Sequence, residues 1–264
     1  MDTQALVKKW ILNNLESVVS YYLLFQRSVK PLAELSVVSL FFYDSDIEDL
    51  KQNLLNPRNI KRINSLNSPL NNDLRLILSA TDFKGLTGKN LIANVPEFIP
   101  LDDQKALERY SYQKPEDGFD FADRKLILKE RLDSKNFDAP DFYAFTHQVF
   151  YLSSFGRRKL SRLDSEYVSQ QLKGIIFRAN ALFNSVNLVD ILAEILIVAS
   201  LNGNLSEVWS EEYKKTIDEF VEEYGEQKPT SKLQMLNPQN DGKDVYHTFI
   251  VLFIFLGLID KYEK

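Results

Sequence analysis

The chain has 264 residues, with 32 Lys and Arg against 37 Asp and Glu, and a formal net charge of −5. Its pI near 5.3 argues against a dedicated nucleic-acid-binding protein, because such proteins usually present a basic face. The absence of cysteine excludes disulfides, thiolate zinc sites and cysteine nucleophiles, and it fits the reducing cytoplasm in which we expect this protein. Nine glycines and nine prolines are few for a β-sandwich or barrel of this length, which favours long helices.

The first half of the chain is predicted to form helices joined by loops. Apolar residues at helical spacing predict, in chain order, helices over Thr3–Gln26, Pro31–Tyr43, Asp46–Leu55, Leu74–Asp82, Leu101–Tyr112 and Phe121–Leu132. Asn and Ser residues between 59 and 72 indicate a loop, and two prolines with a glycine predict an irregular connection over 86–100. No clean domain boundary is evident, so we expect one helical domain over residues 1–264.

The second half is predicted to alternate between apolar and amphipathic helices. These helices, in chain order, are a first histidine-containing helix that begins at Ala139 and ends at Gly156, then Asp164–Phe183, Leu188–Leu201, Glu207–Tyr224 and Lys243–Tyr262, with a polar loop over Gly225–Gly242. Apolar helices are expected to close at Gly85, Gly156, Gly203 and Gly257. The alternation predicts an all-α fold in which stacked α-hairpins form a curved array or partial α/α toroid, with the apolar helices inside.

The most apolar run, Val245–Ile259, is the segment to test for a membrane span. It is shorter than the roughly twenty residues that a bilayer core requires. We therefore predict a buried core helix there and expect no membrane partner.

Only two histidines occur, and both lie in apolar segments that close on a glycine. His147 lies in FYAFTHQVFYLSSFG and His247 in DVYHTFIVLFIFLG, and each is predicted to lie near the start of its helix. A third segment, ILAEILIVASLNG, has the same build, with Glu194 near the equivalent position. We therefore expect the two histidines at corresponding ends of inner helices, facing one rim or cavity.

His147 is the first candidate for acid–base chemistry. Tyr143 and Tyr151 lie four residues to either side of it, so the three side chains share one helix face. An imidazole between two tyrosines suits proton transfer, because small changes in its surroundings move its charge across neutral pH. The alternative is a core histidine whose polar contacts the tyrosines satisfy.

His247 is the second candidate. It is predicted to lie in the first turn of its helix after Asp244 as the cap, where the positive helix end favours a neutral imidazole that can act as a base. Tyr246 and Thr248 add hydroxyl groups beside it. Here too the alternative is structural, a polar residue that closes the end of a buried helix.

The sequence supports the other candidate groups less well. Arg157 and Arg158 suit a phosphate or carboxylate ligand, although capping of a helix C-terminus explains them equally well. A metal site of two histidines with Asp141, Glu194 or Asp244 is conceivable, but no HExxH spacing supports it, and we expect no metal. The chain lacks the GxxxxGK[ST], GxGxxG and GxSxG signatures, so we expect no nucleotide cofactor and no serine-hydrolase chemistry.

The histidine segments resemble an uncharacterised bacterial all-helical family. The resemblance is carried by Thr146-His147-x-x-Phe150-Tyr151, which runs on to Phe155-Gly156-Arg157, and by the later Tyr246-His247-Thr248. Members of that family carry THxxFYxTDFG and C-terminal YHT segments, and some are encoded near natural-product gene clusters. This chain has Ser153-Ser154 where the pattern has Thr-Asp, so an activity that depends on that acidic residue would be lost.

Three functions remain open from the sequence. The first is an enzyme-like tailoring protein, with acid–base chemistry on a peptide or small metabolite in a helical cavity that the two histidines and the tyrosines line. The second is a noncatalytic helical module that binds a peptide or partner protein, for example as an accessory protein of a biosynthetic pathway. The third is a structural or immunity protein without a catalytic or binding site. The oligomeric state is not predicted.

Overall fold

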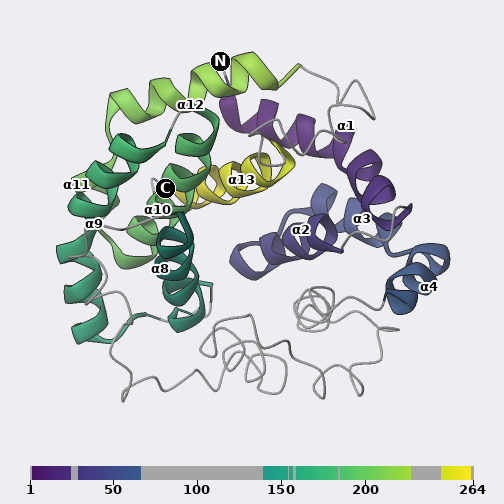
Figure 1. The fold of residues 1–264 in the computed structure, drawn as a ribbon, viewed down its shortest axis with the longest axis horizontal. Coiled ribbons are helices and arrows are strands. Elements are labelled where there is room, and N and C mark those ends of the chain that lie inside the picture. The colour runs from purple at the N-terminus through teal and green to yellow at the C-terminus, as the bar shows by residue number, and fades with distance from the viewer. Residues whose placement is uncertain are drawn as a thin grey trace. The chain divides into compact units, whose positions relative to one another are not determined.

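The computed structural model describes residues 2–24, 29–66, 139–153, 155–156, 159–183, 185–226 and 245–262 (Figure 1). Every secondary-structure element in these ranges is an α-helix, which confirms the all-α prediction. The predicted helices Leu74–Asp82, Leu101–Tyr112 and Phe121–Leu132 and the predicted connection over 86–100 lie outside the described residues. None of the helices in the described ranges is both long and apolar enough to cross a membrane.

The chain divides into two compact units. One comprises Met1–Trp10 with Asp120–Lys264, and the other comprises Ile11–Phe119. The described helices of the first unit, apart from the start of α1, are α8 (Ala139–Leu152), α9 (Arg162–Leu182), α10 (Ser185–Asn202), α11 (Leu205–Val208), α12 (Glu211–Tyr224) and α13 (Val245–Tyr262). The second unit holds the rest of α1 (Thr3–Leu24), with α2 (Lys30–Phe41), α3 (Ser45–Leu54) and α4 (Pro57–Ser65).

In the second unit, side-chain caps fix where α3 and α4 begin. The Asp44 carboxylate accepts hydrogen bonds from the main-chain N–H groups of Asp46 and Ile47, each at 3.1 Å. Asn56 ends α3 as predicted, but it also caps α4, because its side chain accepts from the N–H of Asn59 at 3.0 Å and Pro57 follows it. The first part of the loop predicted over 59–72 is therefore helical.

In the first unit, serine caps set two helix starts. Ser161 begins α9 by accepting from the N–H of Asp164 at 3.2 Å, and Ser210 begins α12 by accepting from Tyr213 at 3.3 Å. The helix predicted over Glu207–Tyr224 is consequently two helices, α11 and α12, separated at Trp209 and Ser210. On α12, Ile217 and Phe220 are buried, at 1% and 4% exposure, whereas Tyr213 is partly exposed.

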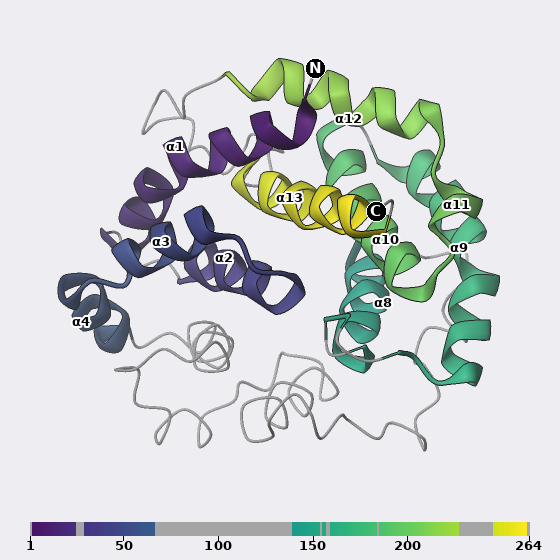
Figure 2. The ribbon, with the colours of Figure 1, turned by 180° about the vertical axis from the view of Figure 1, so that it is seen from behind.

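Helix α10 lies at the centre of the first unit, where it contacts α8, α9, α11, α12 and α13 (Figure 2). All residues from 191 to 200 are buried, as are residues 248 to 255 of α13. By contrast, α9 buries one stripe of side chains, which are Val168, Leu172, Ile175, Ile176 and Ala179. Helices α10 and α13 are therefore largely buried in the first unit, as their composition predicts, while the arrangement as stacked hairpins or a toroid stays a prediction.

Among the described residues, a glycine ends α10, but the predicted glycine ends of α8 and α13 are wrong. Gly203 follows α10 with φ of 77°, and the next residue, Asn204, donates its N–H to the carbonyl of Ala199 at 2.8 Å, which is a Schellman end. The predicted helix end at Gly156, which has φ of 83°, is wrong, because α8 ends four residues earlier, at Leu152. The predicted end at Gly257 is wrong, because α13 continues to Tyr262. Burial of Leu258, at 2% exposure, outweighs the cost of about 1 kcal/mol for a glycine in a helix.

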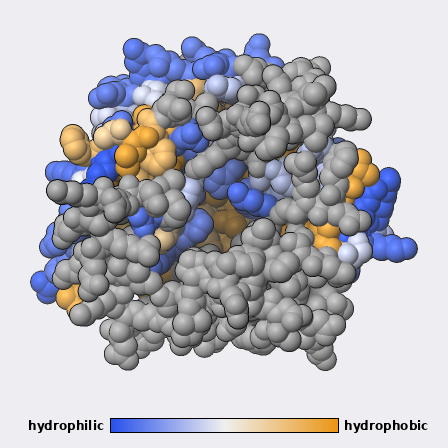
Figure 3. All heavy atoms as spheres, viewed as in Figure 1, coloured by the Kyte–Doolittle hydropathy of each residue, from blue (hydrophilic) through white to orange (hydrophobic). Residues whose placement is uncertain are grey.

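Where described residues are visible in Figure 3, hydrophilic side chains cover most of the surface, with separate hydrophobic areas between them. Among the described residues, the exposed large hydrophobic side chains are Leu24, Tyr43, Leu163, Phe177 and Leu182. Scattered exposed apolar residues of this kind are usual for a folded protein and do not mark a site by themselves.

Candidate functional site

Two buried carboxylates form the base of the candidate site. Asp190 and Glu194 lie four residues apart on α10, so they share one face of that helix, and their exposures are 0% and 2%. Removing a carboxylate from water costs several kcal/mol unless charged or hydrogen-bonding partners compensate. The neighbouring helices must therefore supply such partners.

Three hydroxyl groups from α8 and α13 hold these carboxylates. The Tyr143 hydroxyl donates to Asp190 Oδ2, and Thr248 Oγ1 donates to Asp190 Oδ1 at 3.1 Å. On the other carboxylate, Thr146 Oγ1 donates to Glu194 Oε2. The oxygens that the histidines contact are Oδ1 of Asp190, which also accepts from Thr248, and Oε1 of Glu194.

Both histidines contact the same carboxylate oxygen. The Nε2 atom of His247 lies 3.6 Å from Glu194 Oε1 and 3.6 Å from Asp190 Oδ1, and the Nε2 atom of His147 lies 3.9 Å from Glu194 Oε1. Their side chains differ in exposure, at 40% for His147 and 16% for His247. The two imidazoles and the two carboxylates therefore form one group, which we call the His–carboxylate cluster: His147, Asp190, Glu194 and His247.

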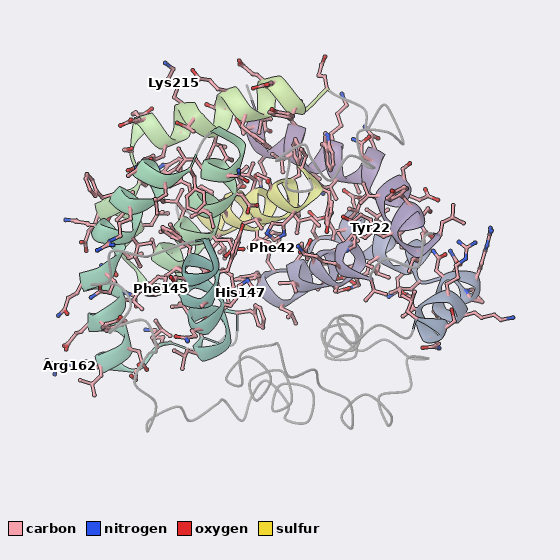
Figure 4. The ribbon with its side chains drawn as sticks, viewed as in Figure 1. Tyr22, Phe42, Phe145, His147, Arg162 and Lys215 are labelled. Carbon is pink, nitrogen blue, oxygen red and sulfur yellow. The ribbon has the colours of Figure 1, made fainter. Side chains whose placement is uncertain are left out.

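The face of α8 that carries His147 is distinct from the face that packs into the core. His147 and Phe145 are two residues apart and project on opposite sides of the helix (Figure 4). Phe145 is fully buried, whereas His147 is partly exposed beside the rings of Tyr143 and Phe150, whose centroids each lie 6.1 Å from the imidazole. A ligand at this face would meet an imidazole with aromatic rings on either side.

The electrostatics of the cluster favour an ionised Glu194. Burial by itself raises the pKa of this carboxyl group, but a hydrogen bond from His247, the charges of His147 and His247 and the hydrogen bond from Thr146 outweigh it. The net effect is a pKa below the ordinary value of 4.5. The anion is therefore maintained by the imidazoles, which means that the protonation states of these groups are coupled.

A family model described as "Domain of unknown function (DUF6895)" matches residues 92–254, more than half of the chain. This chain belongs to the DUF6895 family. No curated protein and no solved structure matches it. The expected membership of an uncharacterised family is thereby confirmed, while the motif pattern and bacterial source stay predictions. All four residues of the His–carboxylate cluster lie inside the DUF6895 region.

The histidines of this DUF6895 protein do not occupy corresponding helix ends, contrary to the prediction. His147 lies in the second half of α8, whereas His247 lies in the first turn of α13. They meet because α8 and α13 both pack on α10, where Glu194 reaches each of them.

Several predicted site groups fall outside what the structure describes. These are Arg157, Arg158, Asp244 and the side chain of Tyr151. Of the remaining candidates, Tyr143 and Thr248 belong to the hydroxyl set around Asp190, and Tyr246 is buried at 3% exposure. Within the described ranges, no group of three or more His, Cys, Asp or Glu side chains is placed to hold a metal ion.

Asp190 is the member of the cluster that sequence reasoning missed. A signal for it exists, because Asp190 and Glu194 are the only charged residues in the apolar helix SVNLVDILAEILIVASLN and lie one turn apart. Carboxylates in such a helix are almost never buried without partners. The pair therefore predicts donors on the neighbouring helices, although it does not say which residues supply them.

Proposed function

We propose that this DUF6895 protein is an enzyme-like tailoring protein whose His–carboxylate cluster performs acid–base chemistry on a peptide or small metabolite. One observation carries the proposal: the Nε2 atoms of His147 and His247 both contact Oε1 of the buried Glu194. A structural histidine needs one partner, whereas two imidazoles on one buried carboxylate make a unit that can take up and release protons. The absence of cysteine supports a cytoplasmic setting.

His147 is assigned as the group that exchanges a proton with the ligand. Its side chain is 40% exposed, while Glu194 is buried behind it at 3%. An accessible base that a buried carboxylate orients is the arrangement of general-base sites. The distance of 3.9 Å is longer than a hydrogen bond, and such contacts commonly shorten when a ligand binds. His247 and Asp190, which are less exposed, set the charge balance around Glu194.

The experiment is a comparison of wild-type protein with His147→Gln in peptide and metabolite mixtures, read by mass spectrometry for converted species. We expect conversion by the wild type and a loss of at least about 100-fold in His147→Gln, because a positioned general base contributes roughly that much. Arg162→Gln is the control, since that side chain is exposed on α9 and pairs only with Glu166 among the contacts seen.

The outcome that would contradict an enzyme is binding without conversion. A ligand that the wild type binds and returns unchanged, with His147→Gln binding it equally well, supports the noncatalytic peptide- or protein-binding module. Far-UV circular dichroism of each variant establishes that a loss of conversion is not a loss of fold.

A further inference from the structure

His247 is shared between the two buried carboxylates of the cluster. Its Nε2 atom lies 3.6 Å from Asp190 Oδ1 and 3.6 Å from Glu194 Oε1, and its side chain is 16% exposed. A protonated imidazole at this position attracts both carboxylates at once, although it supplies only one positive charge. His247 in its protonated form is therefore the counter-ion that the two carboxylates share, and it is the less exposed of the two histidines.

His147 supplies the second positive charge of the cluster. Its Nε2 atom lies 3.9 Å from Glu194 Oε1, and its side chain is 40% exposed. When both imidazoles are protonated, the charges of the four side chains sum to zero; when His147 is neutral, one negative charge remains among them. A general base must be neutral before it can accept a proton. The form of the cluster that can act as a base is therefore anionic.

An anionic group behind a partly exposed imidazole distinguishes ligands by their charge. Glu194 is 3% exposed, so water and salt screen its charge less than that of a surface carboxylate. The rings of Tyr143 and Phe150 lie beside the same imidazole, with centroids 6.1 Å from it, and aromatic rings attract organic cations. A positively charged ligand is favoured at His147, whereas a negatively charged one is repelled.

We propose that the substrate of this site is an organic cation, a peptide or small metabolite whose primary ammonium group binds against the neutral imidazole of His147 and replaces its proton in the charge balance. The proposal rests on the proposed function, because it names the substrate class of the same site. Affinity for the cation should rise as the pH rises through the His147 titration midpoint. The neutral fraction increases about tenfold from one pH unit below the midpoint to one above it, so the dissociation constant should fall about tenfold.

Three helices of the first unit supply the groups that control this charge. Helix α8 contributes His147 and Tyr143, α10 contributes Asp190 and Glu194, and α13 contributes His247. The other helices that pack on α10, which are α9, α11 and α12, add no hydrogen bond or ion pair to Glu194 among the contacts of the described residues. The expected pH dependence is therefore that of the imidazoles.

The test uses three probes that share a benzene ring and differ in charge: benzylamine, benzyl alcohol and benzoate. In protein labelled with ¹⁵N-histidine, the two imidazoles of the chain report binding by NMR, and a pH titration of the same sample gives the His147 midpoint. Above that midpoint, we expect protonated benzylamine to bind at least about tenfold more tightly than benzyl alcohol, because a partly buried charge pair contributes at least that much. Benzoate should bind least.

Two variants separate the charge of Glu194 from the proton of His147. Glu194→Gln should reduce the preference for benzylamine over benzyl alcohol to less than about threefold, because the carboxylate behind the imidazole is lost. His147→Gln should keep the preference and lose its pH dependence, with binding read on His247; it also provides the test if Glu194→Gln does not fold. Glu166→Gln is the matched control, since Glu166 pairs with the exposed Arg162 on α9, and it should behave as the wild type.

Equal dissociation constants for benzylamine and benzyl alcohol, or tighter binding of benzoate, would overturn the assignment of a cationic substrate. A benzylamine dissociation constant above about 10 mM, or one that does not change across the His147 midpoint, would overturn it as well. Conversion that depends on His147 without a preference for benzylamine would leave the proposed function standing. A preference for benzylamine without conversion in any mixture would instead contradict the proposed function and leave a binding site for cations.

Discussion

At the scale of single residues, Glu194 is the group on which the site depends. Its side chain is 3% exposed, and it contacts His147, His247 and Thr146. A buried anion with these partners is stable, whereas the same anion without them would cost several kcal/mol. The sequence could predict His147 and His247 as candidate site residues, because they are the only two histidines and both lie in apolar segments. It could not predict Glu194 as their common partner, because Glu194 is 47 or more residues away from each and the register between the helices is a property of the fold.

Replacing Glu194 should change stability in a pH-dependent way. The folded-state pKa of this group lies below 4.5, so its carboxylate contributes stability that is fully present above pH 4.5 and is lost as the pH falls through the folded value. We expect Glu194→Gln to lower the free energy of unfolding at pH 7 by about 3 kcal/mol and to flatten its decline below pH 4.5, as measured by urea titrations between pH 3 and pH 7.

Glu166→Gln is the control for this substitution. Glu166 forms an exposed ion pair with Arg162 on α9, with side chains 51% and 90% exposed, so its loss should change stability by less than about 0.5 kcal/mol. Equal slopes below pH 4.5 for the wild type and Glu194→Gln would show that Glu194 is not the ionised group of the cluster.

At the scale of elements, local sequence determines which segments form helices, while a few residues determine where each helix begins and ends. The caps Asp44 and Asn56 and the Schellman end at Gly203 coincide with patterns that the sequence shows directly. Gly257 has the same pattern without ending its helix, because α13 gains more by burying Leu258 than it loses at the glycine. Local signals could therefore predict which segments are helical but not which glycines terminate them.

Two exposed glycines provide a matched test of this point. A Cβ atom added at Gly174, inside α9, or at Gly203, after α10, would meet no atom within 4 Å, so space is not the difference between them. Gly203→Ala should destabilise the protein by about 1 kcal/mol, because its φ is 77°, whereas Gly174→Ala should stabilise it by about 0.5 to 1 kcal/mol. Urea unfolding of both variants checks this; changes of the same sign would contradict it.

At the scale of the whole molecule, the first unit joins the start of the chain to its end. Trp10 of α1 stacks on Phe249 of α13 with ring centroids 4.2 Å apart and planes at 4°. Trp10 is buried, at 4% exposure, but no local sequence pattern indicates that its partner lies in the last helix. The same limit applies to the site, which three separate segments assemble.

The two tryptophans of the chain allow this long-range contact to be measured. Trp10→Ala should lower the free energy of unfolding by about 3 to 5 kcal/mol, because it removes a buried ring from the core. Trp209 is only half-buried and meets Phe255 edge-on at 5.2 Å, so Trp209→Ala should cost less. A greater loss in Trp209→Ala, measured by urea unfolding, would mean that the start of α1 contributes little to the first unit.

The central claim is that His147 and His247 act as one unit through Glu194, and the most direct test is the NMR titration of His247 in wild-type protein and in His147→Gln. The account predicts that the His247 midpoint rises by about half a pH unit in His147→Gln, because a competing cation leaves the shared carboxylate oxygen, and that this rise disappears when Glu194→Gln is added. An identical His247 midpoint with and without His147 would contradict it.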